Sequence, residues 1–142
     1  MIERQGNIWS VWGQPNQIVL VTTNNVRGKG GLIMGKGIAL EGAKRVPGLP
    51  LAMFSFGDKD YHLMIFPGNG IGCLQTKRHW KDKTPLDLLE KSISALRECV
   101  LLDNMTTYHL PRPGCGNGGL NWEKDVKHLC EQLPDNCIVW SL

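Results

Sequence analysis

The chain has 142 residues, of which 42% are hydrophobic and 20% are charged, and its formal net charge is +3. This composition suits one folded domain over residues 1–142, and it excludes both a disordered chain and a strongly basic, histone-like protein. No segment reaches the roughly 20 apolar residues of a membrane span, and the N-terminus lacks the apolar segment of a signal peptide. We therefore expect a cytoplasmic protein that makes no membrane contact.

The cysteines and histidines carry little sign of metal chemistry. Five cysteines are present, an odd number, and none forms a C-x-x-C pair. Metal ligands and a disulfide framework normally show paired or regularly spaced cysteines. We expect no metal, no other cofactor, and thiols kept reduced in the cytoplasm.

The first half of the chain predicts mostly strands. Residues 17–22 are apolar and β-branched, which is typical of a buried strand. Residues 35–45 predict a helix. Residues 51–56 and 61–66 predict two further strands, and a short extended segment follows at 71–75.

The second half alternates two helices with two strands. The helices are predicted at 84–102 and 122–132, and the strands at 106–110 and 137–142. Thr84 and Asn121 are the predicted N-caps of the two helices. The alternation predicts an α/β fold, namely a three-layer α/β/α sandwich around a mixed, mostly parallel sheet. Ligands of such folds bind at the carboxyl ends of the strands, on loops that lead into helices.

Two glycine-rich loops occupy that position, at residues 22–37 and 111–119. Their backbone N–H groups, each with a helix N-terminus behind them, favour a phosphate-containing ligand held from both sides. A tight turn is the alternative for either loop alone. The first loop also contains G-x-x-x-x-G-K, but Gly37 stands where a magnesium-binding Ser or Thr is needed, which argues against nucleotide triphosphate hydrolysis.

A basic segment, TKRHWKDK at 76–83, lies between these loops in the sequence. Basic side chains mixed with an aromatic ring suit contact with a phosphate backbone and a stacked base. The residues expected to contact nucleic acid are Arg78, His79, Trp80 and Lys81. The alternative is a solvated loop whose Trp80 packs on the following helix.

Five segments, taken in order, resemble the macrodomain family, whose members bind ADP-ribose. They are GNIW at 6–9, VTTNN at 21–25, MGKGIAL at 34–40, TKRHW at 76–80 and PRPGCGNGGLNW at 111–122. Within the family the chain is most similar to the branch that contains the DNA ADP-ribosyl glycohydrolase antitoxin and the terminal ADP-ribose protein glycohydrolase. The resemblance implies an α/β/α fold and, as the partner, ADP-ribose or an ADP-ribosylated substrate, including ADP-ribosylated DNA. We expect the protein to be a monomer.

The resemblance also assigns site residues. It implies that Lys77 is catalytic, because a neutral lysine amine can attack the anomeric carbon, or the ring-opened aldehyde, and form a covalent intermediate. The implied ADP-ribose-binding residues are Asn7, Ile8, Thr22, Asn25, Gly35, Lys36, Gly37, Ile38, Ala39, Thr76, Pro113, Gly114, Cys115, Gly116, Asn117, Gly118 and Leu120.

The sequence departs from the family pattern at four places. Asn7 replaces the more common Asp, Thr22 replaces an asparagine, and residues 26–33 form a longer loop that adds two basic side chains. Gly118 stands where the protein-directed relative has a catalytic aspartate. The leading hypothesis is a glycohydrolase that removes ADP-ribose from a DNA base or nucleotide. Removal from acidic protein side chains, binding of ADP-ribose without catalysis, ADP-ribose 1″-phosphate hydrolysis and plain nucleic-acid binding stay open.

Overall fold

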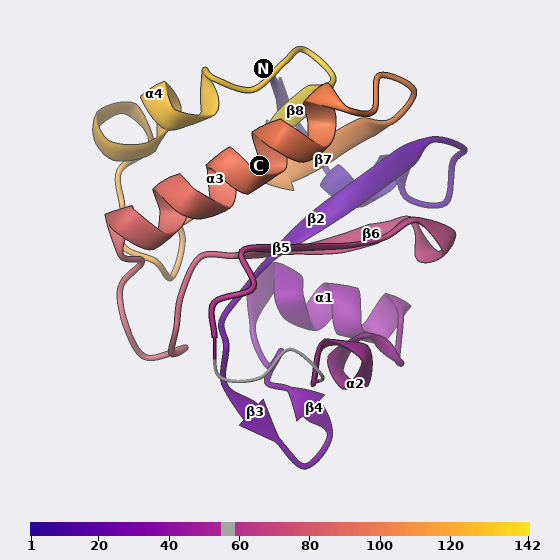
Figure 1. Cartoon of the computed structure of the whole chain (residues 1–142), viewed down its shortest axis with the longest axis vertical. Helices are drawn as coiled ribbons and strands as arrows, with labels where there is room; N and C mark the ends of the chain where they lie inside the picture. Colours follow the sequence, from indigo (N-terminus) through magenta and orange to yellow (C-terminus); the bar gives the residue numbers. More distant parts are fainter. Residues whose placement is uncertain (55–58) are drawn as a thin grey trace.

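A mixed six-stranded sheet forms the centre of the protein (Figure 1). The computed structural model describes residues 1–54 and 59–142. The sheet order is β1-β8-β7-β2-β6-β5, and all neighbouring strands are parallel except β5, which is antiparallel to β6. The strands are β1 (Ile2–Gln5), β2 (Gln17–Thr23), β5 (Leu63–Phe66), β6 (Ile71–Gln75), β7 (Thr107–Pro111) and β8 (Cys137–Ser141).

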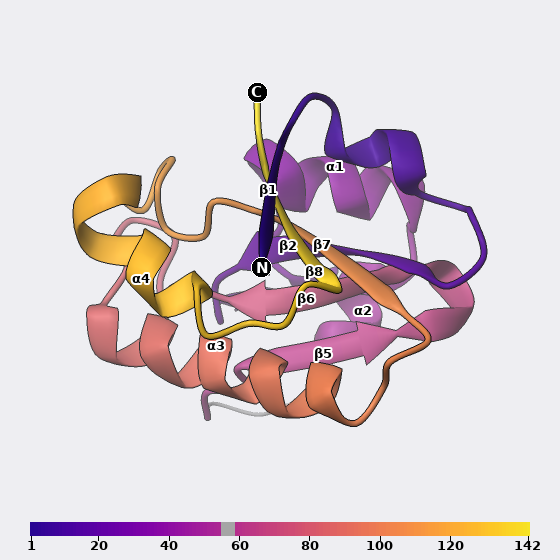
Figure 2. The same ribbon diagram turned by 90° about the horizontal axis from the view of Figure 1, so that it is seen from above.

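Helices cover both faces of this sheet, so that α1 and α3 lie on opposite sides of it (Figure 2). One layer contains the 3-10 turn η1 (Ile8–Val11), α1 (Gly37–Arg45) and α2 (Leu49–Met53). The other contains α3 (Leu86–Leu101) and α4 (Lys127–Cys130), the latter preceded by a π-helical turn, η4 (Trp122–Val126). The predicted three-layer α/β/α sandwich is therefore confirmed.

The central strand β2 explains why there are two cores. Its side chains alternate between the faces, so Ile18 and Leu20 join the cluster under α3 and α4, while Val19 and Val21 join the cluster on the α1 side. All four are buried, which is the pattern of a strand covered on both faces. Helix α1 approaches β2 closely at Gly42, where an added Cβ would lie 3.0 Å from the Val21 side chain.

Two predictions from the sequence are wrong. The strand predicted at 51–56 is replaced over Leu49–Met53 by helix α2, because Pro50 suits the first turn of a helix and Leu49 and Met53, one turn apart, are both buried. Residues 55 and 56 of that prediction lie outside the described residues. Thr84 is not the N-cap of α3, since Pro85 occupies that position in an extended conformation. Asn121, by contrast, accepts a hydrogen bond from the backbone of Lys124 as predicted.

The sequence analysis missed three short strands. Strand β1 carries no apolar periodicity, because all four of its side chains are exposed. Strands β3 (Arg27–Gly28) and β4 (Gly31–Leu32) form a hairpin inside the first glycine-rich loop. Gly31 makes that hairpin possible, because it has φ +111° and a Cβ there would lie 2.1 Å from the Pro50 carbonyl oxygen.

No helix among the described residues is long and apolar enough to cross a membrane.

Candidate functional site

Three loops meet at one edge of the sheet because the strands that precede them, β2, β6 and β7, are parallel. The segment before β5 reaches the same edge because β5 is antiparallel to β6. Backbone hydrogen bonds fix the central pair of loops, since the N–H groups of Thr76 and Lys77 both donate to the Thr23 carbonyl, at 2.9 and 3.2 Å. The sheet edge predicted to carry the site therefore brings together both glycine-rich loops and the basic segment 76–83.

Lys77 connects two of these loops. Its Nζ donates to the carbonyl oxygen of Asn117 at 3.0 Å and to that of Trp80 at 3.2 Å. Asn117 belongs to the second glycine-rich loop, 40 residues away in the sequence. The lysine implied as catalytic thus lies against the loop implied to hold a phosphate.

The second glycine-rich loop is held by its own backbone and by Thr84. Gly114 adopts a left-handed conformation with φ +76°, and its carbonyl accepts from Leu120 at 2.9 Å. The Thr84 N–H donates to the Gly118 carbonyl at 2.9 Å. A Cβ on Gly118 would lie 2.4 Å from both the Gly114 oxygen and the Thr84 hydroxyl oxygen, so position 118 has no room for any side chain, including a carboxylate.

The first glycine-rich loop ends at the N-terminus of α1. An added Cβ on Gly35 or Gly37 would meet nothing within 4 Å, so the backbone there is open to an approaching ligand. Lys36 is the N-cap residue, and among the described residues no side-chain hydrogen bond caps the helix. The first N–H groups of α1 are therefore available to an anion, while Ile38 and Ala39 pack part of their surface on the core.

Two of the implied contacts are already engaged within the protein. The Asn7 side chain accepts from the Trp9 N–H at 3.0 Å and caps η1, while Ile8 is buried. The Asn25 amide donates to the Lys59 carbonyl at 2.9 Å and accepts from Arg27 at 2.9 Å. Both amides thus have a structural role in the protein alone.

The remaining implied residues lie at the same edge with different degrees of exposure. Thr22 is half-buried near the end of β2, and Thr76, Pro113 and Gly114 are buried. Gly116 is exposed, and an added Cβ there would meet nothing within 4 Å. Burial raises the pKa of Cys115 to about 11, which favours the protonated thiol over the nucleophilic thiolate.

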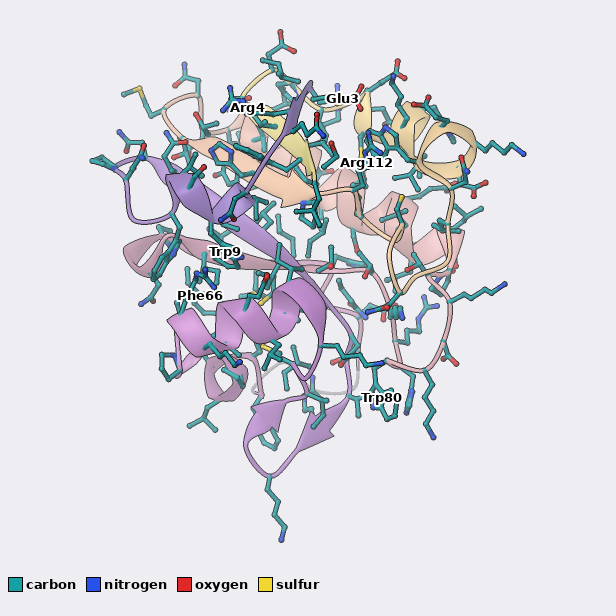
Figure 3. The ribbon with its side chains drawn as sticks, turned by 180° about the vertical axis from the view of Figure 1, so that it is seen from behind. Glu3, Arg4, Trp9, Phe66, Trp80 and Arg112 are labelled. Carbon is teal, nitrogen blue, oxygen red and sulfur yellow. The ribbon has the colours of Figure 1, made fainter. Side chains whose placement is uncertain are left out.

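The basic segment is partly ordered by its own contacts. Trp80 exposes half of its surface at the periphery of the molecule (Figure 3), so part of its ring is open to a ligand. The Lys81 ammonium lies 5.2 Å from the centre of its ring, and the His79 ring is 5.2 Å from it. His79 Nδ1 also accepts from the Lys81 N–H at 3.1 Å. Arg78, in contrast, is paired with Asp60 at 3.0 Å.

Sequence reasoning missed Gln75 and Asp60. Gln75 is fully buried at the end of β6 and binds four groups around the site. Although partial burial opposes the shift, hydrogen bonds from Arg78 and Gln75 hold the pKa of Asp60 below its usual range. The sequence held one signal for each residue. Gln75 is the polar residue that ends the apolar segment 71–75, and Asp60 directly precedes the strand predicted at 61–66.

Comparisons with known proteins identify the class. The structure superimposes on the macrodomain of Mycobacterium tuberculosis DarG with a TM-score of 0.76 and 26% identity, covering 99% of this chain and 97% of that one. It also matches the fold of Thermosipho africanus DarTG in complex with ADP-ribose, with a TM-score of 0.73 and 20% identity over 99% of this chain and 41% of that one. The chain therefore belongs to the macrodomain family, as the five motifs indicated.

A curated relative places the chain more narrowly. The chain is 31% identical over 137 residues to the DNA ADP-ribosyl glycohydrolase of Mycobacterium tuberculosis, in a match that covers 82% of this chain and 36% of that protein. The match thus spans about a third of that relative's length. No family model matches the chain. The protein is a macrodomain related to the DarG DNA ADP-ribosyl glycohydrolases.

Proposed function

We propose that this macrodomain binds ADP-ribose and removes it from a modified DNA base, with Lys77 as the catalytic residue. The name of the curated relative, DNA ADP-ribosyl glycohydrolase, supports the reaction. The ADP-ribose complex of the DarTG protein with the same fold supports the ligand. The exposed basic segment with Trp80 supports a nucleic-acid substrate over a protein one.

The position of Lys77 is the observation that carries the proposal. Its amine bonds to the carbonyl of Asn117, so it lies beside the second glycine-rich loop at the edge where the open N-terminus of α1 also lies. In our proposal the loop ending at Gly35 and Gly37 and the loop around Gly116 bind the diphosphate through backbone N–H groups. The sugar that carries the base then projects toward Lys77.

The chemistry assigned to Lys77 is a displacement at the anomeric carbon. The neutral amine forms a bond to that carbon while the bond to the base nitrogen breaks, and the electron pair leaves with the base, which takes up a proton from water. The amine nitrogen loses its proton to solvent, and a second water molecule then hydrolyses the lysine adduct to release ADP-ribose. Position 118 has no room for a carboxylate, and this mechanism uses none there, because water and solvent accept and supply the protons.

The test compares Lys77→Ala with Lys91→Ala, which removes an exposed lysine in α3. We expect Lys77→Ala to abolish release of ADP-ribose from base-modified DNA, while calorimetry still detects ADP-ribose binding. Lys91→Ala should match the wild-type protein in both assays. Turnover retained by Lys77→Ala would refute the lysine mechanism. ADP-ribose binding without release by the wild-type protein would instead indicate a binding-only role.

A further inference from the structure

A cavity opens at the same edge of the sheet, between the segment that precedes β5 and the segment that follows β6. Its volume is about 400 Å³, and the described residues that line it are Asn25, Lys59, Asp60 and Arg78. Two of these side chains are cations and one is a carboxylate. The volume lies within the range of small-ligand sites, and a lining of polar and charged groups suits a charged ligand.

Arg78 is held in a fixed orientation in this cavity. Its Nε and Nη2 both donate to one oxygen of Asp60, at 3.2 and 3.0 Å, and Nη2 also lies 3.6 Å from the Asp87 carboxylate. Within the described part of the chain, Nη1 donates to no acceptor. A guanidinium that is fixed along one edge presents its remaining N–H groups with little loss of side-chain entropy on binding.

Asp60 is itself held from behind by Gln75. The Gln75 amide nitrogen donates to the other oxygen of Asp60 at 2.9 Å and to the Lys77 carbonyl at 3.2 Å. Its amide oxygen accepts from the backbone N–H groups of Tyr61 and His62 at 2.9 and 3.2 Å. All four hydrogen bonds of the buried Gln75 amide are to fixed groups of the site edge, so Gln75 fixes Asp60, and the two bonds from Arg78 to Asp60 fix the guanidinium.

Lys77 and Arg78 reach in opposite directions from consecutive positions. Lys77 contacts Asn117, which follows β7, while Arg78 contacts Asp60, which precedes β5. In the sheet β7 and β5 lie on opposite sides of β6. A substrate strand that presents one nucleotide to Lys77 and continues toward β5 therefore runs past Arg78, since the two side chains start from adjacent Cα atoms about 3.8 Å apart.

We propose that the cavity formed by Asn25, Lys59, Asp60 and Arg78 is a phosphodiester subsite for the DNA strand that carries the modified base. Arg78 and Lys59 bind the phosphate, and Asp60 and Gln75 are positioning residues that act through Arg78. This inference rests on the proposed function and adds to it the part of the substrate beyond the ADP-ribose. Phosphate contacts of this kind fix the register of a strand without reading its sequence.

The sign of one substitution tests the subsite. Asp60→Asn removes a negative charge beside Arg78 and Lys59, so charge alone predicts tighter binding of DNA. The positioning role predicts weaker binding, because Arg78 loses its anchor. Asp82→Asn is the matched control, since it removes an exposed carboxylate from the same basic segment, and no ion pair to it is found among the described residues.

The first measurement is the affinity of each variant for an unmodified single-stranded oligodeoxynucleotide over a range of salt concentrations. We expect Arg78→Ala to weaken binding about tenfold and to make the slope of log K against log salt shallower by about 0.7, the value for one phosphate contact. Asp60→Asn should weaken binding severalfold, and Asp82→Asn should leave it unchanged or tighter. Tighter binding by Asp60→Asn, or an unchanged slope in Arg78→Ala, would overturn the proposal.

The second measurement separates the subsite from the proposed reaction. We expect the ratio of kcat/KM for an ADP-ribosylated oligonucleotide to that for the matching ADP-ribosylated nucleoside to fall about tenfold in Arg78→Ala. An unchanged ratio would contradict the subsite. If the wild-type protein turns over neither substrate, the proposed function fails, and the oligonucleotide affinities still decide whether the cavity binds DNA.

Discussion

Replacing Gln75 with leucine tests the network that supports the site edge. The side chain is 0% exposed, and its four hydrogen bonds join the end of β6 to the segment before β5 and to Lys77. Leucine is of similar size but pairs with none of these groups. The substitution therefore leaves two N–H groups, one carbonyl and one carboxylate oxygen without their partner.

The expected loss follows from these contacts. A hydrogen bond between neutral groups stabilises a fold by about 1 kcal/mol and one to a charged group by about 2 kcal/mol, so the four together contribute about 5 kcal/mol. Burial of the leucine side chain returns about 2 kcal/mol. We expect Gln75→Leu to lower the free energy of unfolding by about 3 kcal/mol, a large part of the roughly 5–15 kcal/mol that stabilises a typical domain.

Urea unfolding with linear extrapolation measures this loss. Gln5→Leu is the control, because Gln5 is exposed and its side chain makes one bond, to the Leu142 carbonyl at 3.2 Å. The control should change the free energy of unfolding by no more than about 0.5 kcal/mol. A loss below about 1 kcal/mol in Gln75→Leu, or equal losses in both variants, would refute the role given to this network.

Two further predictions concern stability. Gly118→Ala should lower the free energy of unfolding by about 1–3 kcal/mol, because its Cβ would lie 2.4 Å from the Gly114 oxygen. Gly116→Ala is the control, since a Cβ there meets no atom within 4 Å. Equal thermal stability of the two variants would contradict this packing. Burial, with a smaller effect of Arg4, lowers the pKa of His109 to about 4. The contribution of the neutral His109 to the free energy of unfolding should therefore be fully present above about pH 6.5 and decline as the pH falls toward 4. His109→Gln should flatten this decline in urea unfolding curves recorded across that pH range, and an unchanged profile would show that another group is responsible.

The contacts of His109 give the physical reason for its pH dependence. Its Nδ1 accepts from the Trp140 indole at 3.0 Å, and its Nε2 lies 2.6 Å from the Gln17 side-chain oxygen. Both bonds are satisfied only when Nε2 carries the proton and Nδ1 does not. Protonation of Nδ1 removes the acceptor of Trp140 inside the core, which favours the unfolded state at low pH.

Much of the fold was accessible from the sequence because its signals are local. The continuous apolar run of β2 reflects a strand that is buried on both faces. The helical spacing of Leu89, Ile93 and Leu96 reflects a helix, α3, that is buried on one face. The strand prediction was wrong over residues 51–53, because an apolar run of that length suits a helix and a strand equally. Pro50 favours the helix because it occupies its first turn, and the hairpin at Gly31 packs against the Pro50 carbonyl.

The site was accessible only as a set of loops. Glycine spacing and the order of strands and helices predict which loops meet at one sheet edge, and the structure brings them together there. The bond from Lys77 to Asn117 and the Gln75–Asp60–Arg78 network depend on contacts between segments far apart in the sequence. No local pattern encodes such contacts, and for this reason Asp60 and Gln75 were missed.

The most direct test of the central proposal incubates the protein with DNA ADP-ribosylated on a base and, in parallel, with a protein ADP-ribosylated on glutamate. Release of ADP-ribose is followed from both substrates over the same time course. We predict that the DNA loses its modification and that the glutamate ester is spared or cleaved far more slowly. Release from the protein alone, or from neither substrate, would contradict the proposal.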